Sequence, residues 1–225
     1  MTATITRRDV QTREAVSREL QWDRCVDDRA INIEVQCGVV TLTGKVGSYA
    51  QKMAAVEAAR RVNSVLDVID HIAVIPAPEE TRNDEEIARA IREGLGWNAR
   101  LAGVQIQVEV SDGQVTLRGE VPFLCLREYA GQFAGQFAGV RQVINEIEVR
   151  AAAVEAGTVK QAIEEALDRY AAREKEHIQV AFENGTVTLT GWVYHWDEKQ
   201  AALRAASFAP GVQRIEDHLR INPFF

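Results

Sequence analysis

The chain carries one nine-residue pattern three times, and this repeat constrains its fold more than any other feature. Each copy reads glycine, any residue, Val-Thr-Leu, any residue, glycine, any residue, valine, and the copies are 75 and 72 residues apart. A period of this length is the size of a small domain and is much longer than one turn of a solenoid. The 225-residue chain is therefore predicted to hold three tandem domains. The copies lie at 38–46, 113–121 and 185–193.

Composition shifts between the copies set the predicted boundaries. The first linker contains a pair of prolines, Pro76 and Pro78, which we expect to stiffen the connection. The second linker is rich in alanine and just as short, so we expect a compact or semi-rigid array. The predicted domains are 9–75, 84–150 and 158–222, with linkers at 76–83 and 151–157.

Each unit has the same predicted order of elements. Apolar residues at helical spacing come first, and a stretch of alternating apolar and polar residues follows at 31–35, 106–110 and 178–182. A tight turn then leads into a second, antiparallel strand. An alanine-rich helix, at 48–62 in the first copy, and a valine-led strand complete the unit through a right-handed parallel crossover. The predicted class is α+β: three tandem α-β-β-α-β domains, each a three-stranded mixed sheet with two helices on one face.

Six glycines and two carboxylates are assigned structural roles. The first glycine of each copy supplies the positive φ of a hairpin turn, and the second lies inside a strand, where a bulge or a close backbone approach is the usual reason. Asp9 and Asp84 lie at matching positions near the first turn of the first helix, where a carboxylate accepts hydrogen bonds from free backbone N–H groups. The turn glycines are Gly38, Gly113 and Gly185, and the strand glycines are Gly44, Gly119 and Gly191.

The charge balance argues against nucleic acid as a partner. The chain has 26 basic and 33 acidic residues, and no segment forms a basic arm. Its start shows no secretory leader, and no stretch of about 20 apolar residues could span a bilayer, so we expect a cytoplasmic protein. The cysteines, Cys25, Cys37 and Cys125, are odd in number and lack metal-ligand spacing, so they are interpreted as buried or incidental thiols.

No catalytic, metal-binding or cofactor-binding constellation is found in the sequence. The four histidines lack metal-ligand spacing, and His71 and His218 are placed on third strands one register position apart. The serines lack a nucleophile-elbow context, and the paired carboxylates are interpreted as solvated surface groups. We therefore predict no catalytic residue, no metal and no cofactor.

The second helix of the middle domain has an unusual composition. Glycines recur every four residues in this predicted helix, up to Gly139, and aromatic residues are interleaved with them. Each helical glycine costs about 1 kcal/mol relative to alanine, so an offsetting contact is expected. One hypothesis makes this helix a packing hub onto a sister domain or a second chain; the other has the aromatics fill their own core. The residues concerned are Tyr129, Gly131, Phe133, Gly135 and Phe137.

Aromatic residues also mark the third domain. Trp192, Tyr194 and Trp196 fall where the second strand meets the second helix, and such a cluster suits a membrane interface, a protein contact or a cap on the small core. Trp22 and Trp97 are matched between the first two copies at the end of the first helix, and we interpret them as lids on the core.

The repeated unit resembles the BON domain, named for bacterial osmotically inducible and nodulation proteins. The resemblance rests on the glycine-flanked Val-Thr-Leu pattern, the alanine-rich helix and a valine-led strand carrying Asp70, Asn145 or Asp217, and it covers nearly the whole chain. It implies the α-β-β-α-β fold, no known catalytic residues, and attachment to phospholipid membranes or envelope components, often in stress responses. Many members are periplasmic or carry a lipoprotein anchor.

These observations lead to one expected function and two alternatives. We expect a non-enzymatic binding or scaffolding protein, related to osmotic or other stress, whose target is a phospholipid membrane surface or an envelope-associated protein. The sequence leaves open whether the chain forms homo-oligomers. One alternative is a soluble chaperone-like protein that binds client polypeptides through exposed aromatics or strand edges. The other is a sensor of a small ligand or ion in a cleft between domains.

Overall fold

Each repeat folds as a separate domain. The computed structural model describes residues 6–77, 82–150, 154, 156–170 and 177–222, without the side chains of 168–170. Within these ranges every repeat builds its own three-stranded sheet in the element order helix, strand, strand, helix, strand. The predicted α+β class and the threefold repetition are thereby confirmed. Parts of the predicted linkers, at 78–81, 151–153 and 155, lie outside the described residues.

The elements match among the three domains. Domain 1 consists of α1 (Arg7–Trp22), η1 (Asp28–Ala30), β1 (Ile31–Gln36), β2 (Val39–Val46), α2 (Tyr49–Arg60) and β3 (Asp67–Val74). Domain 2 consists of α3 (Asp84–Trp97), η3 (Ala99–Leu101), β4 (Ile106–Ser111), β5 (Gln114–Val121), α4 (Leu124–Ala134) and β6 (Gln142–Val149). Domain 3 consists of α5 (Ala156–Tyr170), β7 (Ile178–Glu183), β8 (Thr186–Val193), α6 (Trp196–Ser207) and β9 (Arg214–Ile221).

All three sheets share one topology. The strand that carries the repeated pattern is central: it pairs antiparallel with the strand before it and parallel with the strand after α2, α4 or α6. The first two strands form a hairpin, and the second helix provides the crossover to the third. Both outer strands of each sheet therefore keep one unpaired edge.

The hairpin turns need two consecutive residues with positive φ. The turn glycine has φ between +75° and +79° in the three domains, and the residue before it, Cys37, Asp112 or Asn184, has φ near +50°. This combination defines a type I′ turn, whose twist matches the flanking strands. Aspartate and asparagine tolerate this region better than other non-glycine residues, so Cys37 is the least suited of the three.

The strand glycines allow a close approach of two backbones. Gly44 has φ of +139°, and a Cβ atom there would lie 2.0 Å from the Ala30 carbonyl oxygen. Gly119 would approach Gln105 to 2.4 Å and Gly191 would approach His177 to 1.8 Å. No side chain fits at these positions, because the chain enters the first strand directly against them.

Three separate apolar cores stabilise the domains. The leucine of each Val-Thr-Leu run, Leu42, Leu117 or Leu189, is fully buried beneath the helices. Burying one such side chain contributes about 1.5–3 kcal/mol. The intervening threonine points to the opposite face because strand side chains alternate.

The carboxylates at the start of the first helices connect helix to hairpin. Asp9 closes a capping box with Thr6, and its Oδ1 atom also accepts from the Gly38 N–H at 3.2 Å. Asp84 accepts from the N–H groups of Asp112 and Gly113 at 2.8 and 2.9 Å. These residues therefore fix the hairpin turn onto the helix, in addition to their predicted role in the first turn.

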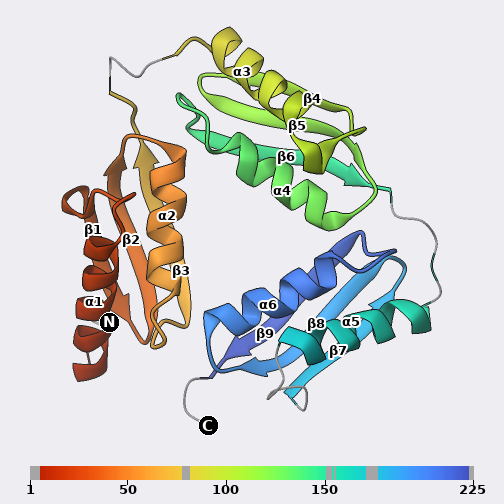
Figure 1. Cartoon of the computed structure of the whole chain (residues 1–225). Helices are drawn as coiled ribbons and strands as arrows, with labels where there is room; N and C mark the ends of the chain where they lie inside the picture. The colour runs from red at the N-terminus through yellow and green to blue at the C-terminus, as the bar shows by residue number, and fades with distance from the viewer. Residues whose placement is uncertain (1–5, 78–81, 151–153, 155, 171–176, 223–225) are drawn as a thin grey trace.

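The second helices of the three domains lie toward the centre of the molecule. Figure 1 shows α2, α4 and α6 facing one another there, while the first helices, α1, α3 and α5, lie on the outside. The second helices therefore take part in the contacts between domains, and the first helices lie on the outer surface.

Candidate binding surfaces

The face of each sheet opposite the helices carries polar residues at matched positions. His71 lies beside Thr43 in domain 1, and His218 lies beside Thr190 in domain 3. The two histidines therefore share one register position, and the predicted offset between them is wrong. Each histidine comes six residues after the valine that precedes the third strand, Val65 or Val212, so the repeat itself places the two histidines at equivalent positions.

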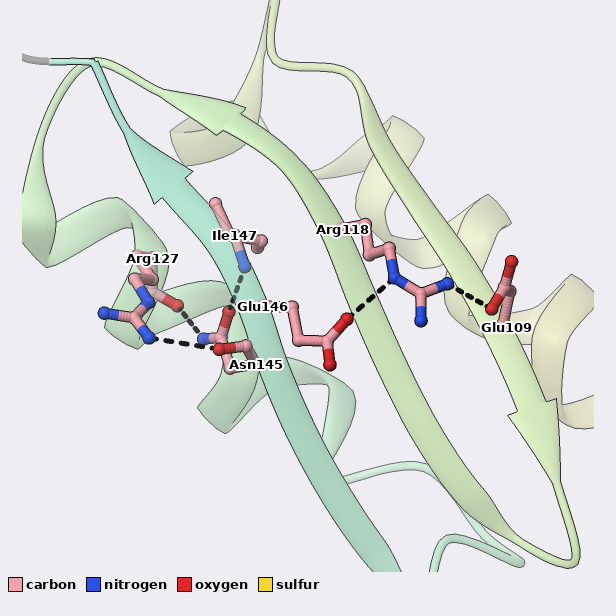
Figure 2. Close-up of polar contacts among 6 residues, drawn as sticks. All are labelled: Glu109, Arg118, Arg127, Asn145, Glu146 and Ile147. Atoms are coloured by element: carbon pink, nitrogen blue, oxygen red, sulfur yellow. Dashed lines mark hydrogen bonds and ion pairs between the residues drawn. The ribbon is translucent and has the colours of Figure 1, made fainter.

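The middle domain has a different group at that position. Arg118 donates to the Glu146 carboxylate at 2.7 Å and to the Glu109 carboxylate across the hairpin, as Figure 2 shows. Hydrogen bonds to both carboxylates raise the pKa of Arg118. All three side chains are well exposed, so this network contributes little to stability but gives the face of domain 2 a fixed charge pattern.

On the helix-covered face, a lysine joins the second helix to the third strand. Lys52 lies 2.9 Å from the Asp70 carboxylate and donates to the Ile72 carbonyl oxygen at 2.9 Å. The other Asp70 oxygen accepts from the Ile72 N–H. We call this arrangement the helix-strand clamp. Its members in domain 3 are Lys199, Asp217 and Leu219, with the ion pair at 2.8 Å.

Domain 2 builds the same clamp without an ion pair. Arg127 donates to the Asn145 carbonyl oxygen at 3.1 Å, and the Asn145 side-chain amide donates to the Arg127 carbonyl oxygen at 2.6 Å (Figure 2). Asn145 Oδ1 accepts from the Ile147 N–H, as the aspartates do in the other domains. The residues that support the family resemblance on the third strand therefore hold the fold together.

Two tryptophans are almost fully exposed. Trp22 keeps 84% of its surface accessible and Trp97 keeps 90%, so the interpretation of both as core lids is wrong. They are the last residues of α1 and α3, two positions beyond Leu20 and Leu95, which are buried. Two residues correspond to about 200° of rotation around a helix, which turns each indole away from the core.

The aromatic residues of domain 3 are half-buried and engaged with neighbours. Trp192 stacks on His177 with ring centroids 3.9 Å apart and meets Tyr194 edge-on at 5.0 Å. Trp196 lies under the guanidinium group of Arg60 from domain 1, 4.4 Å from its ring centroid. Of the three predicted contact residues, Trp196 therefore takes part in a contact between domains.

The aromatic residues of the middle domain's second helix pack inside their own domain, whereas one of its glycines contacts domain 1. Tyr129, Phe133 and Phe137 pack one on another and against the core of their own domain, with Phe133 and Phe137 close to Gly94 of α3. Among the glycines, Gly131 makes room for the Asn145 side chain, and Gly135 makes room for Tyr49 of domain 1.

The end of this helix differs from the prediction. Helix α4 ends at Ala134, Gly135 is its C-cap, and Gly139 lies in the following turn with φ of +89°. The prediction that all these glycines lie inside the helix is therefore wrong, because a turn that needs a left-handed residue interrupts the four-residue spacing.

A cleft of about 480 Å³ separates α2 from α4. Apolar side chains, side-chain amides and two carboxylates line it. Burial raises the pKa of Glu128, one of these carboxylates, and interactions with Ser207 of domain 3 and with Arg127 partly offset the rise. Its lining includes Tyr49, Met53, Glu57, Gly135 and Asn145.

Neither a metal centre nor a membrane span is found among the described residues. No group of three or more histidine, cysteine or carboxylate side chains lies close enough together there to hold a metal ion. None of the helices in the described ranges is both long and apolar enough to cross a bilayer. Cys25 and Cys37 are exposed and Cys125 is half-buried, all as free thiols, so the incidental interpretation fits better than the buried one.

One protein-family model matches each of the three repeats. The BON domain model matches residues 8–76, 83–151 and 156–223. The chain belongs to the BON domain family. BON domains in general contact membranes or proteins and are not catalytic. No curated protein matches the chain.

Two solved structures match over nearly all of the chain. One comes from CdsD, a structural protein of the type III secretion system of Chlamydia trachomatis, with 16% identity over 94% of this chain and 92% of that chain and a TM-score of 0.28. The other, the C-terminal domain of CdsD, has 16% identity over 93% of this chain and 96% of that chain and a TM-score of 0.27.

Proposed function

We propose that this protein is a non-enzymatic binding module that attaches to phospholipid membrane surfaces through Trp22 and Trp97. The proposal rests on the observation that these two tryptophans, at equivalent positions of two domains, are 84% and 90% exposed. Tryptophan is favoured at membrane interfaces, where its ring contacts the acyl boundary and its N–H stays near water. An exposed pair of this kind on the outer helices is suited to insertion into a lipid surface.

The charges around Trp22 support contact with anionic headgroups. Arg13 and Arg18 of α1 are exposed on the helix that ends at Trp22. Of the three acidic residues on that helix, Asp9 is buried, Glu19 is paired with Arg61 at 2.8 Å, and Glu14 is exposed. Each basic residue near an anionic surface contributes about 1 kcal/mol, which offsets the net charge of −7 locally.

Membership of the BON family supports the same proposal, because membrane and protein contacts are general in that family. The aromatic cluster of domain 3 is a second candidate contact, although Trp192 and Trp196 are already packed against neighbouring side chains. The cytoplasmic location and a role in osmotic stress stay predictions.

Flotation with lipid vesicles tests the proposal. The wild-type chain is expected to float with vesicles of phosphatidylcholine and phosphatidylglycerol at low salt, and Trp22→Ala combined with Trp97→Ala is expected to abolish flotation. Trp192→Phe, which changes a half-buried aromatic residue, serves as the control and should float normally. Wild-type protein that stays at the bottom of the gradient at low salt would contradict the proposal. Suppression of client aggregation without lipid would then favour the chaperone-like alternative.

A further inference from the structure

The second helices present equivalent residues to the contacts between domains. The first residue of each helix and the residue eleven positions later occupy matching places in the three repeats. We call these places the head and the tail of the second helix. The heads are Tyr49, Leu124 and Trp196, and the tails are Arg60, Gly135 and Ser207.

At the first junction, the head of α2 meets the tail of α4. A Cβ atom on Gly135 would lie 2.7 Å from Cδ1 of Tyr49, so the tyrosine ring occupies the space that a side chain would need. The Tyr49 N–H also donates to the Val140 carbonyl oxygen at 3.3 Å, and the ring packs against the core of domain 2. Burial in this contact raises the pKa of Tyr49.

At the second junction, the head of α4 meets the tail of α6. Leu124 is 5% exposed and belongs to the apolar core of domain 3, although it is a residue of domain 2. Glu128, one turn further along α4, interacts with Ser207 of domain 3, which lowers the pKa of this carboxyl against the effect of its burial. Here too the tail residue is small and is itself buried.

At the third junction, the head of α6 meets the tail of α2. The guanidinium group of Arg60 lies over the Trp196 ring at 4.4 Å, an attractive arrangement of a cation on an aromatic face. Burial lowers the pKa of Arg60, and its Nε has no hydrogen-bond partner among the described residues. The stacked indole therefore compensates the desolvated guanidinium together with the charges of Asp67, Glu57 and Asp70.

The three junctions share one polarity. Each joins the head of one second helix to the tail of the next, in the order α2 to α4, α4 to α6 and α6 to α2. An interface of this head-to-tail kind forms a ring when the rotation closes. We propose that head and tail form one docking surface, through which the second helix of each domain binds the second helix of another domain of the same chain, and that the contact of Arg60 with Trp196 closes the chain into a three-domain ring.

The third contact has a special position because domains 1 and 3 are not neighbours in the chain. The first two junctions join domains that a short linker already holds close together, which raises their effective concentration. Domains 1 and 3 are connected only through domain 2. Loss of the third contact is therefore expected to open the ring and leave the other two junctions in place.

Small-angle X-ray scattering of the full chain tests this proposal. Arg60→Met and Trp196→Ala should each shift the radius of gyration and the maximum dimension to larger values, with an unchanged far-ultraviolet circular dichroism spectrum. Arg60→Lys, which keeps a cation, should give a smaller shift. The control is Arg61→Met: the neighbouring arginine pairs with Glu19 and Asp23 inside domain 1, so its loss should leave the radius of gyration unchanged.

The two main variants lie in different domains, so misfolding of one does not leave the proposal untested. If Arg60→Met disturbs domain 1, Trp196→Ala still removes the same contact from the other side. Folded Trp196→Ala protein with the wild-type radius of gyration and maximum dimension would overturn the proposal.

Discussion

The ammonium group of Lys52 lies 2.9 Å from the Asp70 carboxylate and joins α2 to β3 in domain 1. Both side chains are less than a third exposed, and the lysine also donates to the Ile72 carbonyl oxygen. Domain 3 repeats this clamp with Lys199 and Asp217, while domain 2 replaces it with neutral and charged hydrogen bonds between Arg127 and Asn145.

Removal of the clamp lysine should destabilise one domain. Lys52→Met leaves the Asp70 carboxylate and the Ile72 carbonyl without their partner, so the free energy of unfolding of domain 1 should fall by about 1–3 kcal/mol. Differential scanning calorimetry would show the loss as a lower transition temperature. Lys199→Met should have a similar effect in domain 3. A double change that copies domain 2, Lys52→Arg with Asp70→Asn, should recover part of the loss, and a result equal to Lys52→Met alone would contradict this explanation.

Cys37→Asn should stabilise domain 1. Cys37 has φ of +50° in a type I′ turn, where the other two domains have Asp112 and Asn184. Asparagine tolerates left-handed backbone better than cysteine, so we expect a gain of about 0.5–1 kcal/mol in the free energy of unfolding. Chemical denaturation measures it, and the reverse change, Asn184→Cys, should lower the stability of domain 3. A loss of stability in Cys37→Asn would refute the argument.

Substitution by alanine should be tolerated at Gly96 and should destabilise the protein at Gly44. Gly44→Ala places a Cβ atom against the Ala30 carbonyl oxygen at a φ of +139°, so it should destabilise domain 1 by about 3 kcal/mol or more. Gly96→Ala, in α3, meets open space at an ordinary helical φ and should stabilise domain 2 by up to about 1 kcal/mol. Thermal unfolding distinguishes the two, and equal effects would be inconsistent with the close backbone approach.

Domain 1 should lose the contribution of Asp9 at acidic pH. The Thr6 hydroxyl, followed by backbone N–H groups, lowers the pKa of Asp9 in the folded protein. The carboxylate therefore adds stability above its unfolded pKa of about 3.9, and this contribution falls away as the pH drops through the lower folded pKa. The free energies of unfolding of wild type and Asp9→Ala should differ by a constant amount between pH 5 and 7, begin to converge near pH 4 and continue to converge at lower pH. A stability difference between wild type and Asp9→Ala that grows as the pH falls would contradict this explanation.

The repeat made the fold predictable, because each copy repeats the same local signals. The alternation at 31–35 and the glycines Gly38 and Gly44 specify a hairpin with one buried face. The helix after Ser48 specifies the parallel crossover to the third strand. The spacing of Ser48 and Gln51 is typical of a capping box, and Ser48 does accept from the Gln51 N–H, but the Gln51 side chain accepts from the Gly47 N–H instead of the Ser48 N–H.

The surfaces were harder to predict than the elements. A tryptophan at the end of an amphipathic helix is usually covered, and only the rotation past Leu20 shows that Trp22 points outward. The contact of Arg60 with Trp196 joins residues 136 positions apart in sequence, and no local pattern reports a contact of that range. The one signal available in the sequence is that Arg60 and Trp196 occupy the tail and head positions of the second helix, which are equivalent in all three repeats.

Tryptophan fluorescence in the presence of brominated phospholipids tests membrane attachment most directly. Bromine quenches only indoles that enter the acyl boundary, so vesicles that carry it should quench wild-type fluorescence. Trp22→Phe combined with Trp97→Phe should remove that quenching while Trp192 and Trp196 continue to fluoresce. Equal quenching in both proteins would show that other tryptophans enter the lipid, and no quenching in wild type would contradict attachment through Trp22 and Trp97.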